Sequence, residues 1–586
     1  MTTVLEKGSF QFPTASGARI ASDQATMDAA VRTLQERKDA WVNVSVRERI
    51  ALIDHLIHDF HALQERWVAA CLQAKGLTAQ SSAAGEEWAT GPYATLKHLR
   101  QLRSSLSDIA RYGSPRIPGP VRALADGQVV AQVFPQTNYD RIFYGGVTAE
   151  VWQQPGVTVE GLPQTMAVAY RQKSAGRVAL VLGAGNVSSI GPMDALYKLF
   201  VENQVVALKA NPVNAYLGPL LEEAFRALVE GGYLRILYGD AAEGAYLCQH
   251  PGIDEIHITG SDKTFDAIVW GVGPEAAARK AAGTPLLQKR ITGELGNVSP
   301  VIVVPGPWSQ SDIAYQAAHI VSMLTNNAGY NCNATRVIIQ REGWDRREPL
   351  LQAMRGIFRQ TPARAAYYPG SHERYAAFTQ AHPEAERFGA EGAGNASDGA
   401  LPWTLISGLD AQATDDICFT TEAFCALFAE TTLAAESVAD YMDRAVDFCN
   451  QQVWGTLSAT LLVHPDSLRD PAVAQAVERG IANLRYGSIG VNYWGGVSFA
   501  LGVTTWGAYP GHPLDDIRSG NGVVHNALMF GQPQKSVIRA KFRLMPIPPW
   551  FATRGKVASS VFRQLADLEA QPSLARAPGI AIAALR

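Results

Sequence analysis

The chain has 586 residues, of which 47% are apolar and 18% charged, and its 51 basic side chains nearly balance its 54 acidic ones. This length suits three or four domains of roughly 150 residues, and the balanced charge gives no reason to expect a nucleic acid or a charged membrane surface as partner. No apolar run approaches the roughly 18 residues of a membrane span, and the N-terminus lacks the basic and apolar tandem of a signal peptide, so we expect a cytoplasmic protein.

Apolar residues recur at helical spacing from 27 to 111, and the face that should be buried carries Ile50, Ile53, Leu56, Ile57, Phe60 and Leu63. From 120 to 175 the pattern changes to short β-type runs, "GQVVAQVF" and "VTAEVW", interrupted by Pro, Gly and Asn. This change indicates an extended arm or hairpins.

The middle of the chain is its most regular part. Short buried strands, "RVALVLGAG", "QVVALKANP", "LRILYGD" and "IDEIHITGS", alternate with helix-length segments, which predicts a parallel, doubly wound α/β sheet. A second series begins with "NVSPVIVVPG", continues through a helix near 311–325 to "TRVIIQ", and includes "WGTLSATLLVHP" farther on. It predicts a second α/β domain, and the last stretch, 536–586, is expected to pack on a neighbour or a partner subunit.

The cysteines and histidines offer no metal site. Six cysteines are scattered without CxxC pairs, so we expect reduced thiols at Cys71, Cys248, Cys332, Cys418, Cys425 and Cys449. Three histidines follow one another at i, i+3 and i+6, an offset that winds them diagonally across a helix: His55, His58 and His61. Another group is interpreted as loop residues: His512, Asp515, Asp516 and His525. No metal is predicted.

One of these cysteines has a distinctive setting. Cys332 stands between Asn331 and Asn333 in the polar stretch "NNAGYNCNATRV". A cysteine taken alone is usually a small buried hydrophobe, whereas a reactive thiol needs exposure and a lowered pKa, which polar loops and backbone N–H groups can supply. No histidine lies in this stretch to form a Cys–His pair, although distant residues could converge.

A carboxylate stands upstream at a position from which it could activate water. Glu294, in "ITGELGNVSPVIVV", lies at the entrance to a buried strand, where its side chain could reach a cleft between two α/β units. At this point the chain resembles the aldehyde dehydrogenase superfamily. "GELGNVSP" is similar to the glutamate motif of that family, and "NNAGYNCNATRV" is similar to its nucleophile motif.

Further motifs occur in the family's order. "LVLGAGNVSSIGP" resembles the segment that carries the oxyanion asparagine, here Asn186, and "VVALKANP" resembles the strand that ends in the cofactor-contacting lysine, here Lys209. "HITGSDKTF" resembles the pyrophosphate segment and "TEAFCALF" the pair that holds the nicotinamide ribose and ring. These two segments place Gly260, Ser261, Glu422 and Phe424 among the cofactor-binding residues. Each residue alone has an ordinary structural interpretation, and their shared order favours the functional one.

The resemblance implies an α/β fold of three parts. A Rossmann-type doubly wound NAD(P)-binding domain would comprise residues 1–125 and 176–292, and an α/β catalytic domain residues 293–528. A β oligomerisation arm with a C-terminal tail would comprise residues 126–175 and 529–586. The arm would complete a partner's sheet in a homodimer or homotetramer.

The activity implied is the NAD(P)-dependent oxidation of an aldehyde to a carboxylic acid through a thiohemiacetal and a thioester on Cys332. Asn186 would hold the oxyanion, and Glu294 would deprotonate the hydrolytic water. The alternatives are a coenzyme A-acylating aldehyde dehydrogenase or acyl-CoA reductase, a catalytically silent scaffold with this fold, and a cysteine hydrolase or amidase. Branches that transfer the acyl group to coenzyme A commonly lack the glutamate, so Glu294 favours hydrolysis.

The chain departs from the family at several positions. Pro212 replaces a glutamate that binds the adenosine ribose in many NAD-specific members, which removes repulsion toward a 2′-phosphate. We therefore expect NADP to be accepted beside NAD, with the preference open. Gly185, Asn297 and Val298 also replace common residues.

The substrate wall is predicted from "YGSIGVNYWGGVSFALGVTTWG". This segment lies in the region that resembles the family's substrate tunnel, and its aromatic side chains suit an apolar or aromatic aldehyde. Core packing is the equally weighted alternative for these residues, Tyr493, Trp494, Phe499 and Trp506.

Overall fold

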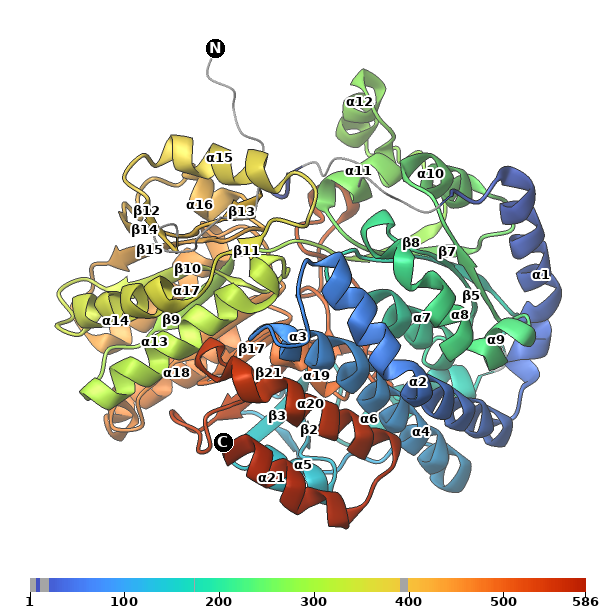
Figure 1. Cartoon of the computed structure of the whole chain (residues 1–586), viewed down its shortest axis with the longest axis horizontal. Helices are drawn as coiled ribbons and strands as arrows, with labels where there is room; N and C mark the ends of the chain where they lie inside the picture. Colours follow the sequence, from blue (N-terminus) through green and yellow to red (C-terminus); the bar gives the residue numbers. More distant parts are fainter. Residues whose placement is uncertain (1–6, 11–19, 173, 390–398, 586) are drawn as a thin grey trace.

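Two β-sheets, each covered by helices, organise the chain (Figure 1). The computed structural model describes residues 7–10, 20–172, 174–389 and 399–585. The six-stranded sheet lies on the right in Figure 1, mostly in teal and green, and most of the larger sheet on the left, from yellow-green to orange. In the described residues no helix is both long and apolar enough to cross a membrane.

The smaller sheet is the doubly wound sheet that the sequence predicts. Its strands follow the order β19 (Gly520–Asn521), β8 (Arg290–Glu294), β7 (Glu255–Thr259), β4 (Val178–Leu182), β5 (Val205–Lys209) and β6 (Leu234–Leu237). The five strands from β8 to β6 are parallel, and β19 pairs antiparallel with β8. Strand β8 contains the expected domain boundary at residues 292 and 293.

Helices cover both faces of this sheet. The helices that pack on it or connect its strands are α1 (Gln24–Asn43), α7 (Ile190–Phe200), α8 (Gly218–Ala224), α9 (Arg226–Glu230), α10 (Ala241–Gln249), α11 (Asp262–Trp270) and α12 (Pro274–Ala282). Because the strands are parallel, their carboxyl ends lie at one edge, which faces the larger sheet.

The larger sheet has eleven strands. Its parallel part follows the order β21 (Pro533–Ala540), β17 (Ser488–Val491), β16 (Ser458–Leu462), β9 (Ser299–Val303), β10 (Thr335–Arg341), β15 (Leu427–Leu433) and β14 (Trp403–Leu409), and β12 (Glu386–Phe388) closes it antiparallel. The helices of this part include α13 (Gln310–Thr325), α14 (Arg347–Gln360), α15 (Ser371–Ala381), α16 (Ile417–Thr420), α17 (Val438–Gln451), α18 (Pro471–Asn483) and α19 (Val497–Leu501). The second α/β series read from the sequence is therefore confirmed.

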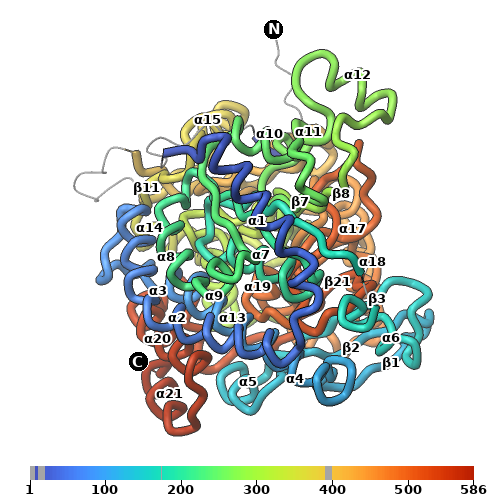
Figure 2. The backbone as a smooth tube through the Cα atoms, turned by 90° about the vertical axis from the view of Figure 1, so that its right-hand side faces the viewer, coloured from blue at the N-terminus to red at the C-terminus, as the bar shows by residue number. Residues whose placement is uncertain are grey.

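The predicted arm forms strands, but it joins the sheet of its own chain. β1 (Val121–Ala123), β2 (Val129–Phe134) and β3 (Val147–Gln153) form an antiparallel ribbon, with α5 (Asn138–Phe143) between β2 and β3. β3 pairs along its whole length with β21, beside which the arm lies in Figure 2. Within this chain the arm extends the chain's own sheet, with β1 as its edge strand, and the completion of a partner's sheet stays a prediction.

The N-terminal helices pack with the C-terminal ones. α2 (Val46–Ala74), α3 (Ala84–Trp88) and α4 (Ala94–Tyr112) contact α20 (Gly555–Ala570), which in turn contacts α21 (Ala577–Leu585). The tail therefore packs on its own chain, drawn red at the bottom of Figure 1. On α2, the predicted apolar face is buried at Ile53, Leu56, Ile57, Phe60 and Leu63, and Ile50 is half-buried.

Candidate active site

The loop that carries Cys332 is held in an uncommon backbone conformation. α13 ends at Thr325, and the chain then passes through left-handed φ angles of 52° at Asn327, 55° at Ala328 and 82° at Gly329. Such angles are unfavourable for residues other than glycine, so the surroundings must fix them. Arg336 does this from β10, since its guanidinium donates to the carbonyl oxygen of Gly329 and, at 2.7 Å, to that of Cys425.

Cys332 is the one cysteine of the six that is not fully buried, and it lines a cavity of about 230 Å³. Its electrostatic setting differs from the sequence expectation. Burial, together with the neighbouring Glu294 carboxylate, raises the pKa of the Cys332 thiol well above its usual value. The flanking asparagines do not lower this pKa, because they support the loop: the Asn331 amide donates to Asn326 Oδ1 at 2.9 Å, and Trp494 donates to the Asn333 carbonyl at 3.0 Å.

Glu294 lies beside the thiol at the end of β8 and is only 3% exposed. Burial raises the pKa of its carboxyl group to about 7, and hydrogen bonding to the Cys332 thiol and to Trp506 opposes this rise. Its Oε1 atom has no hydrogen-bond partner within the protein. Near neutral pH this carboxylate can therefore take up or release a proton, as a general base must.

Asn186 approaches the nucleophile loop from the turn after β4. Its side-chain Nδ2 donates to the carbonyl oxygen of Tyr330 at 2.9 Å, two residues before Cys332. An amide NH₂ group has two N–H donors, so one remains for an oxygen in the cavity, which Asn186 also lines.

A buried network that the sequence analysis did not identify fixes this asparagine. Lys75, at the C-terminal end of α2, donates to Glu87 at 2.7 Å, to the Asn327 side chain at 2.9 Å and to the Asn186 carbonyl at 3.3 Å. Tyr367 donates to the same two acceptors, at 2.9 Å to Asn327 and 3.1 Å to Asn186. In the sequence, a lysine at a helix end is indistinguishable from a solvated one, so no signal pointed to it.

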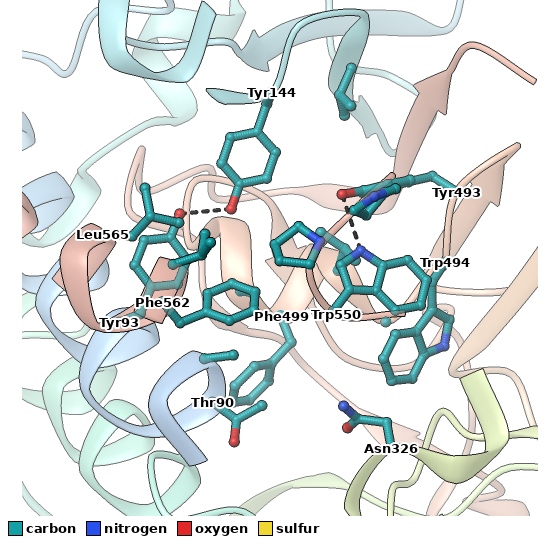
Figure 3. A pocket seen from close by; sticks show the side chains of 18 of the residues that line it. Thr90, Tyr93, Tyr144, Asn326, Tyr493, Trp494, Phe499, Trp550, Phe562 and Leu565 are labelled. Atoms are coloured by element: carbon teal, nitrogen blue, oxygen red, sulfur yellow. Dashed lines mark hydrogen bonds between the residues drawn. The ribbon is translucent and has the colours of Figure 1, made fainter. Parts of the chain in front are cut away.

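The cavity continues from Cys332 between aromatic side chains (Figure 3). All four residues of the predicted substrate wall line it, namely Tyr493, Trp494, Phe499 and Trp506. The opposite wall comes from segments that the sequence analysis did not assign to the site: Thr90, Tyr93, Tyr144, Trp550, Phe562 and Leu565. The motif "MPIPPWF", which carries Trp550, was the available signal, since an aromatic and proline-rich stretch in a tail is costly to expose.

Two hydrogen bonds stabilise the lining, the first within the opposite wall and the second between the two walls. The Tyr93 and Tyr144 hydroxyls lie 2.7 Å apart, and Trp550 donates to the Tyr493 hydroxyl at 3.4 Å (Figure 3). Among the described residues that line the cavity, none carries a charged side chain.

Three residues expected to bind a cofactor lie at the carboxyl ends of two strands of the smaller sheet, β5 and β7, which flank β4. Lys209 ends β5, and its Nζ donates to the Gly239 carbonyl at 2.6 Å, while burial lowers the pKa of its ammonium group to about 8. Gly260 and Ser261 follow β7, and the Ser261 hydroxyl caps α11 by accepting from the Thr264 N–H at 3.1 Å. This edge is where parallel α/β sheets bind their ligands.

Glu422 and Phe424 reach the same crevice from the larger sheet. Burial raises the pKa of Glu422 to about 7, and its carboxylate accepts from the Asn297 N–H at 3.1 Å and from the Ser9 hydroxyl at 3.3 Å. Phe424 has a φ of 41°, and its ring lies 5.9 Å from that of Tyr330 in the nucleophile loop.

Ser9 connects these two sets of residues, since its N–H donates to Asp262 at the start of α11 at 2.9 Å. The departures from the family pattern also find a local reason. A Cβ atom at Gly185 would come within 2.6 Å of Asn211 Oδ1, so no side chain fits there.

One group with metal-ligand chemistry occurs within the described ranges, outside this cavity. Ligand atoms of His382, Asp416 and Cys418 lie within 4.8 Å of one another. His382 bonds Asp416 at 3.2 Å and Glu384 at 2.9 Å, and these contacts, Asp416 first, raise the pKa of the imidazole above its usual value. Ion pairing satisfies these atoms, so the group requires no metal ion.

Comparison with known proteins gives a family for part of the chain. Residues 154–402 match the model of the aldehyde dehydrogenase family. The matched range contains Asn186, Lys209, Ser261, Glu294 and Cys332, whereas Glu422 and the aromatic wall lie outside it.

Curated relatives also align over only part of the chain. The chain is 32% identical to 4-trimethylaminobutyraldehyde dehydrogenase of Homo sapiens over 144 residues, which are 24% of this chain and 26% of the relative. It is 30% identical to N-succinylglutamate 5-semialdehyde dehydrogenase of Novosphingobium aromaticivorans over 172 residues, 29% of this chain and 33% of the relative. The chain thus spans about a quarter to a third of the length of these relatives.

Solved structures align over nearly the whole chain. An aldehyde dehydrogenase C mutant of Pseudomonas syringae in complex with NAD+ and octanal has a TM-score of 0.60 and 17% identity, covering 94% of this chain and 99% of that one. The NADP-dependent glyceraldehyde-3-phosphate dehydrogenase of Bacillus halodurans, complexed with NADP, has a TM-score of 0.58 and 16% identity, with 90% and 94% covered. At these identities the likeness shows the fold.

Proposed function

We propose that the chain is a member of the aldehyde dehydrogenase superfamily, whose family model matches residues 154–402, and that it oxidises an apolar or aromatic aldehyde to the carboxylic acid with NAD(P) as hydride acceptor. The observation that carries this proposal is the cavity that ends on Cys332 and Asn186, with Glu294 beside the thiol. A nucleophile, an amide donor and a base of suitable pKa thereby surround one small volume.

The walls of the cavity favour an apolar substrate. Its lining in the described residues is uncharged, so an aldehyde with a charged far end would lose its hydration without gaining a partner. A dry apolar cavity of about 150 Å³ accommodates benzene, and this cavity measures about 230 Å³. It therefore suits an aromatic ring or a medium aliphatic chain beside the aldehyde group.

The first chemical step is a proton transfer followed by addition. Because burial raises the pKa of the Cys332 thiol, we infer that the Glu294 carboxylate takes its proton as the sulfur attacks the aldehyde carbon. The Asn186 amide and the Cys332 backbone N–H hold the resulting oxyanion, and such donors are worth about 3 to 4 kcal/mol each in related chemistry.

The second step forms and hydrolyses the thioester. A bound nicotinamide would supply the acceptor for the hydride of the substrate carbon. Glu294 releases the first proton to solvent and then takes a proton from water as the water oxygen attacks the thioester. The carbon–sulfur bond breaks, and the remaining proton of the acid passes to the departing Cys332 sulfur, which restores the thiol. The product is the carboxylate.

The cofactor-side residues offer suitable chemistry. The Lys209 ammonium has three donors, of which Gly239 takes one, and the Glu422 carboxylate can accept from ribose hydroxyls. Ser261 starts a helix whose N–H groups favour a phosphate. Glu422 is shared with Ser9, so the ribose would compete with this hydroxyl.

Location and assembly belong to the same proposal. The six cysteines are free, which suits a reducing cytoplasm. A homodimer or homotetramer rests on the resemblance alone, because the arm pairs within its own chain. Light scattering on the purified protein tests it.

The test of function is cofactor reduction at 340 nm with a panel of aliphatic and aromatic aldehydes, using NAD and NADP, with and without coenzyme A. We expect reduction without coenzyme A, which Cys332→Ala abolishes and Cys449→Ala, a change of a buried thiol in α17, preserves. Activity that requires coenzyme A would support the acylating alternative, and silence in every arm would contradict the proposal.

A further inference from the structure

A continuous row of polar side chains leads away from Glu294 through the interior of the smaller sheet. In the register of β7 and β8, Thr259 lies opposite Glu294, His257 opposite Thr292, and Glu255 opposite Arg290. Every second residue of a strand points to the same face, and register partners on parallel strands share that face. We call these six side chains the polar row. All of them except Arg290 are buried.

Helix α7 covers this row and adds two charged groups one turn apart. Asp194 accepts from the Thr259 hydroxyl at 2.8 Å, and Lys198 donates to Glu255 at 2.6 Å. Between these contacts stands His257, whose Nε2 lies 3.7 Å from Asp194 Oδ2 and whose Nδ1 lies 2.9 Å from the Thr292 hydroxyl. A shift of a few tenths of an ångström closes the longer gap to a hydrogen bond.

Two atoms along this path have no hydrogen-bond partner, although buried polar atoms normally do. They are His257 Nε2 and Glu294 Oε1. Burial raises the pKa of Asp194 well above its usual value despite the bond from Thr259, and the Glu294 carboxylate contributes to the rise. Thr259, which donates to Asp194, lies opposite Glu294 in the strand register, so this threonine stands between the two carboxyl groups.

The far end of the row opens to solvent. Thr292 and Arg290 line a second cavity of about 610 Å³ together with Tyr197, Glu202 and Gln204. The Arg290 side chain is 52% exposed. The row thus connects the buried base of the active site with an aqueous surface that the aldehyde does not use.

We propose that Asp194, His257 and Thr292 conduct to this second cavity the proton that Glu294 takes from the hydrolytic water. The proposal rests on the proposed function, which requires Glu294 to release a proton in every turnover. With 3% exposure, this side chain has little direct access to solvent.

The transfer is balanced at each atom. As the water oxygen bonds to the thioester carbon, one of its protons passes to Glu294, and the carbon–sulfur bond pair returns to Cys332. The Glu294 proton then moves to the Asp194 carboxyl group while the Asp194 proton moves to His257 Nε2. The Nδ1 proton of His257 passes to the Thr292 hydroxyl, whose own proton leaves to water.

His257 is suited to both accepting and donating. The charged and titratable groups that influence it are Asp194 and Lys198 on α7, Glu255 on its own strand, Arg290 on β8 and His525 on β20 (Val524–His525). Burial, followed by Lys198, lowers the pKa of His257 well below its usual value. The imidazole is therefore neutral at rest, with one nitrogen free to accept.

The test uses the full-length protein with Thr292→Val and His257→Gln, which keep the side-chain size and remove the transfer. The matched control is Thr431→Val, because Thr431 is also buried and donates to a carbonyl, that of Leu409 at 2.7 Å, in the other sheet. Cofactor reduction is followed by stopped flow, and proton release by a pH-indicator dye in weak buffer. Melting temperatures identify any variant that does not fold.

We expect both row variants to keep the amplitude of the first burst of reduced cofactor, to lose at least tenfold in steady-state turnover, and to release the proton after the burst. Imidazole buffer, which can enter the second cavity, should restore turnover of Thr292→Val and leave Thr431→Val unchanged. Proton release in step with wild type, or turnover unaffected in a folded row variant, would overturn the proposal. Absence of aldehyde-dependent cofactor reduction in the wild type would instead contradict the proposed function.

Discussion

Substitution of Glu294 by glutamine keeps the size of the side chain and removes its capacity to accept a proton. With a pKa of about 7 in the structure, the carboxylate is ionised roughly ten to one at pH 8. A positioned general base contributes roughly 10²- to 10⁴-fold, which is about 2.7 to 5.4 kcal/mol in the activation barrier. We therefore expect steady-state turnover at pH 8 to fall by this factor in Glu294→Gln.

The burst of reduced cofactor should survive but change its pH dependence. In the wild type its rate should rise through pH 7, because Glu294 takes the Cys332 proton. In Glu294→Gln the thiol must ionise unaided, and burial raises its pKa, so the burst rate should still be rising at pH 9 and above. Stopped-flow absorbance at 340 nm from pH 6 to pH 10 measures both. Unchanged turnover, or a burst profile that still bends near pH 7, would refute this reasoning.

Glu294→Gln should also be more stable than the wild type at pH 8. The folded-state pKa of Glu294, about 7, lies above the ordinary 4.5, so the wild type loses stability as the pH rises from 4.5 to 7. The difference in the free energy of unfolding is at most about 3 kcal/mol, and the melting temperatures of the two proteins should converge below pH 4.5. Trp550→Ala should enlarge the cavity and raise kcat/KM for longer aldehydes relative to shorter ones by roughly 10- to 200-fold. A series of aldehydes of increasing chain length measures this ratio. An equal loss for all substrates would mean that Trp550 only supports the fold. Pro212→Glu should raise the KM for NADP relative to NAD by placing a carboxylate near the 2′-phosphate, and an unchanged ratio would contradict our assignment of this turn. Ser9→Ala should lower the KM for the cofactor several-fold at constant kcat, because it frees Glu422 Oε2. Titration of the protein with the cofactor, followed by cofactor fluorescence, measures the affinity directly, and weaker binding in the variant would contradict this prediction.

Regular elements were predictable because their signals are local. The helical face of residues 53–63 and the strands of both α/β series follow from periodicity, which depends only on neighbours in the chain. The arm's strands were predictable for the same reason, but their partner was not. Pairing of β3 with β21 joins residues almost 400 positions apart in sequence, and only the packed sheet decides between this chain and another.

The residues of the candidate site stay a prediction from motif order, and their electrostatics could not be predicted. Cys332 and Asn186, both named by that order, line one cavity, and Glu294 lies beside the Cys332 thiol. The raised pKa of Cys332 comes from burial and from the Glu294 carboxylate, which reaches the thiol from a strand of the other sheet. No local pattern around a cysteine can report the environment that distant segments build.

The sequence contained the alternating polar residues of the proposed proton path, but only the pairing of β7 with β8 shows that they form one path. Parallel strands buried on both faces are normally near-continuous in apolar residues, and the alternation in "EIHIT" and "RITGE" breaks that expectation on one face. Either strand alone could carry isolated buried polar groups. Once the register sets His257 opposite Thr292 and Thr259 opposite Glu294, the polar face becomes continuous. Glu294 must lose a proton in every turnover and is only 3% exposed, and this polar face leads from it to the second cavity.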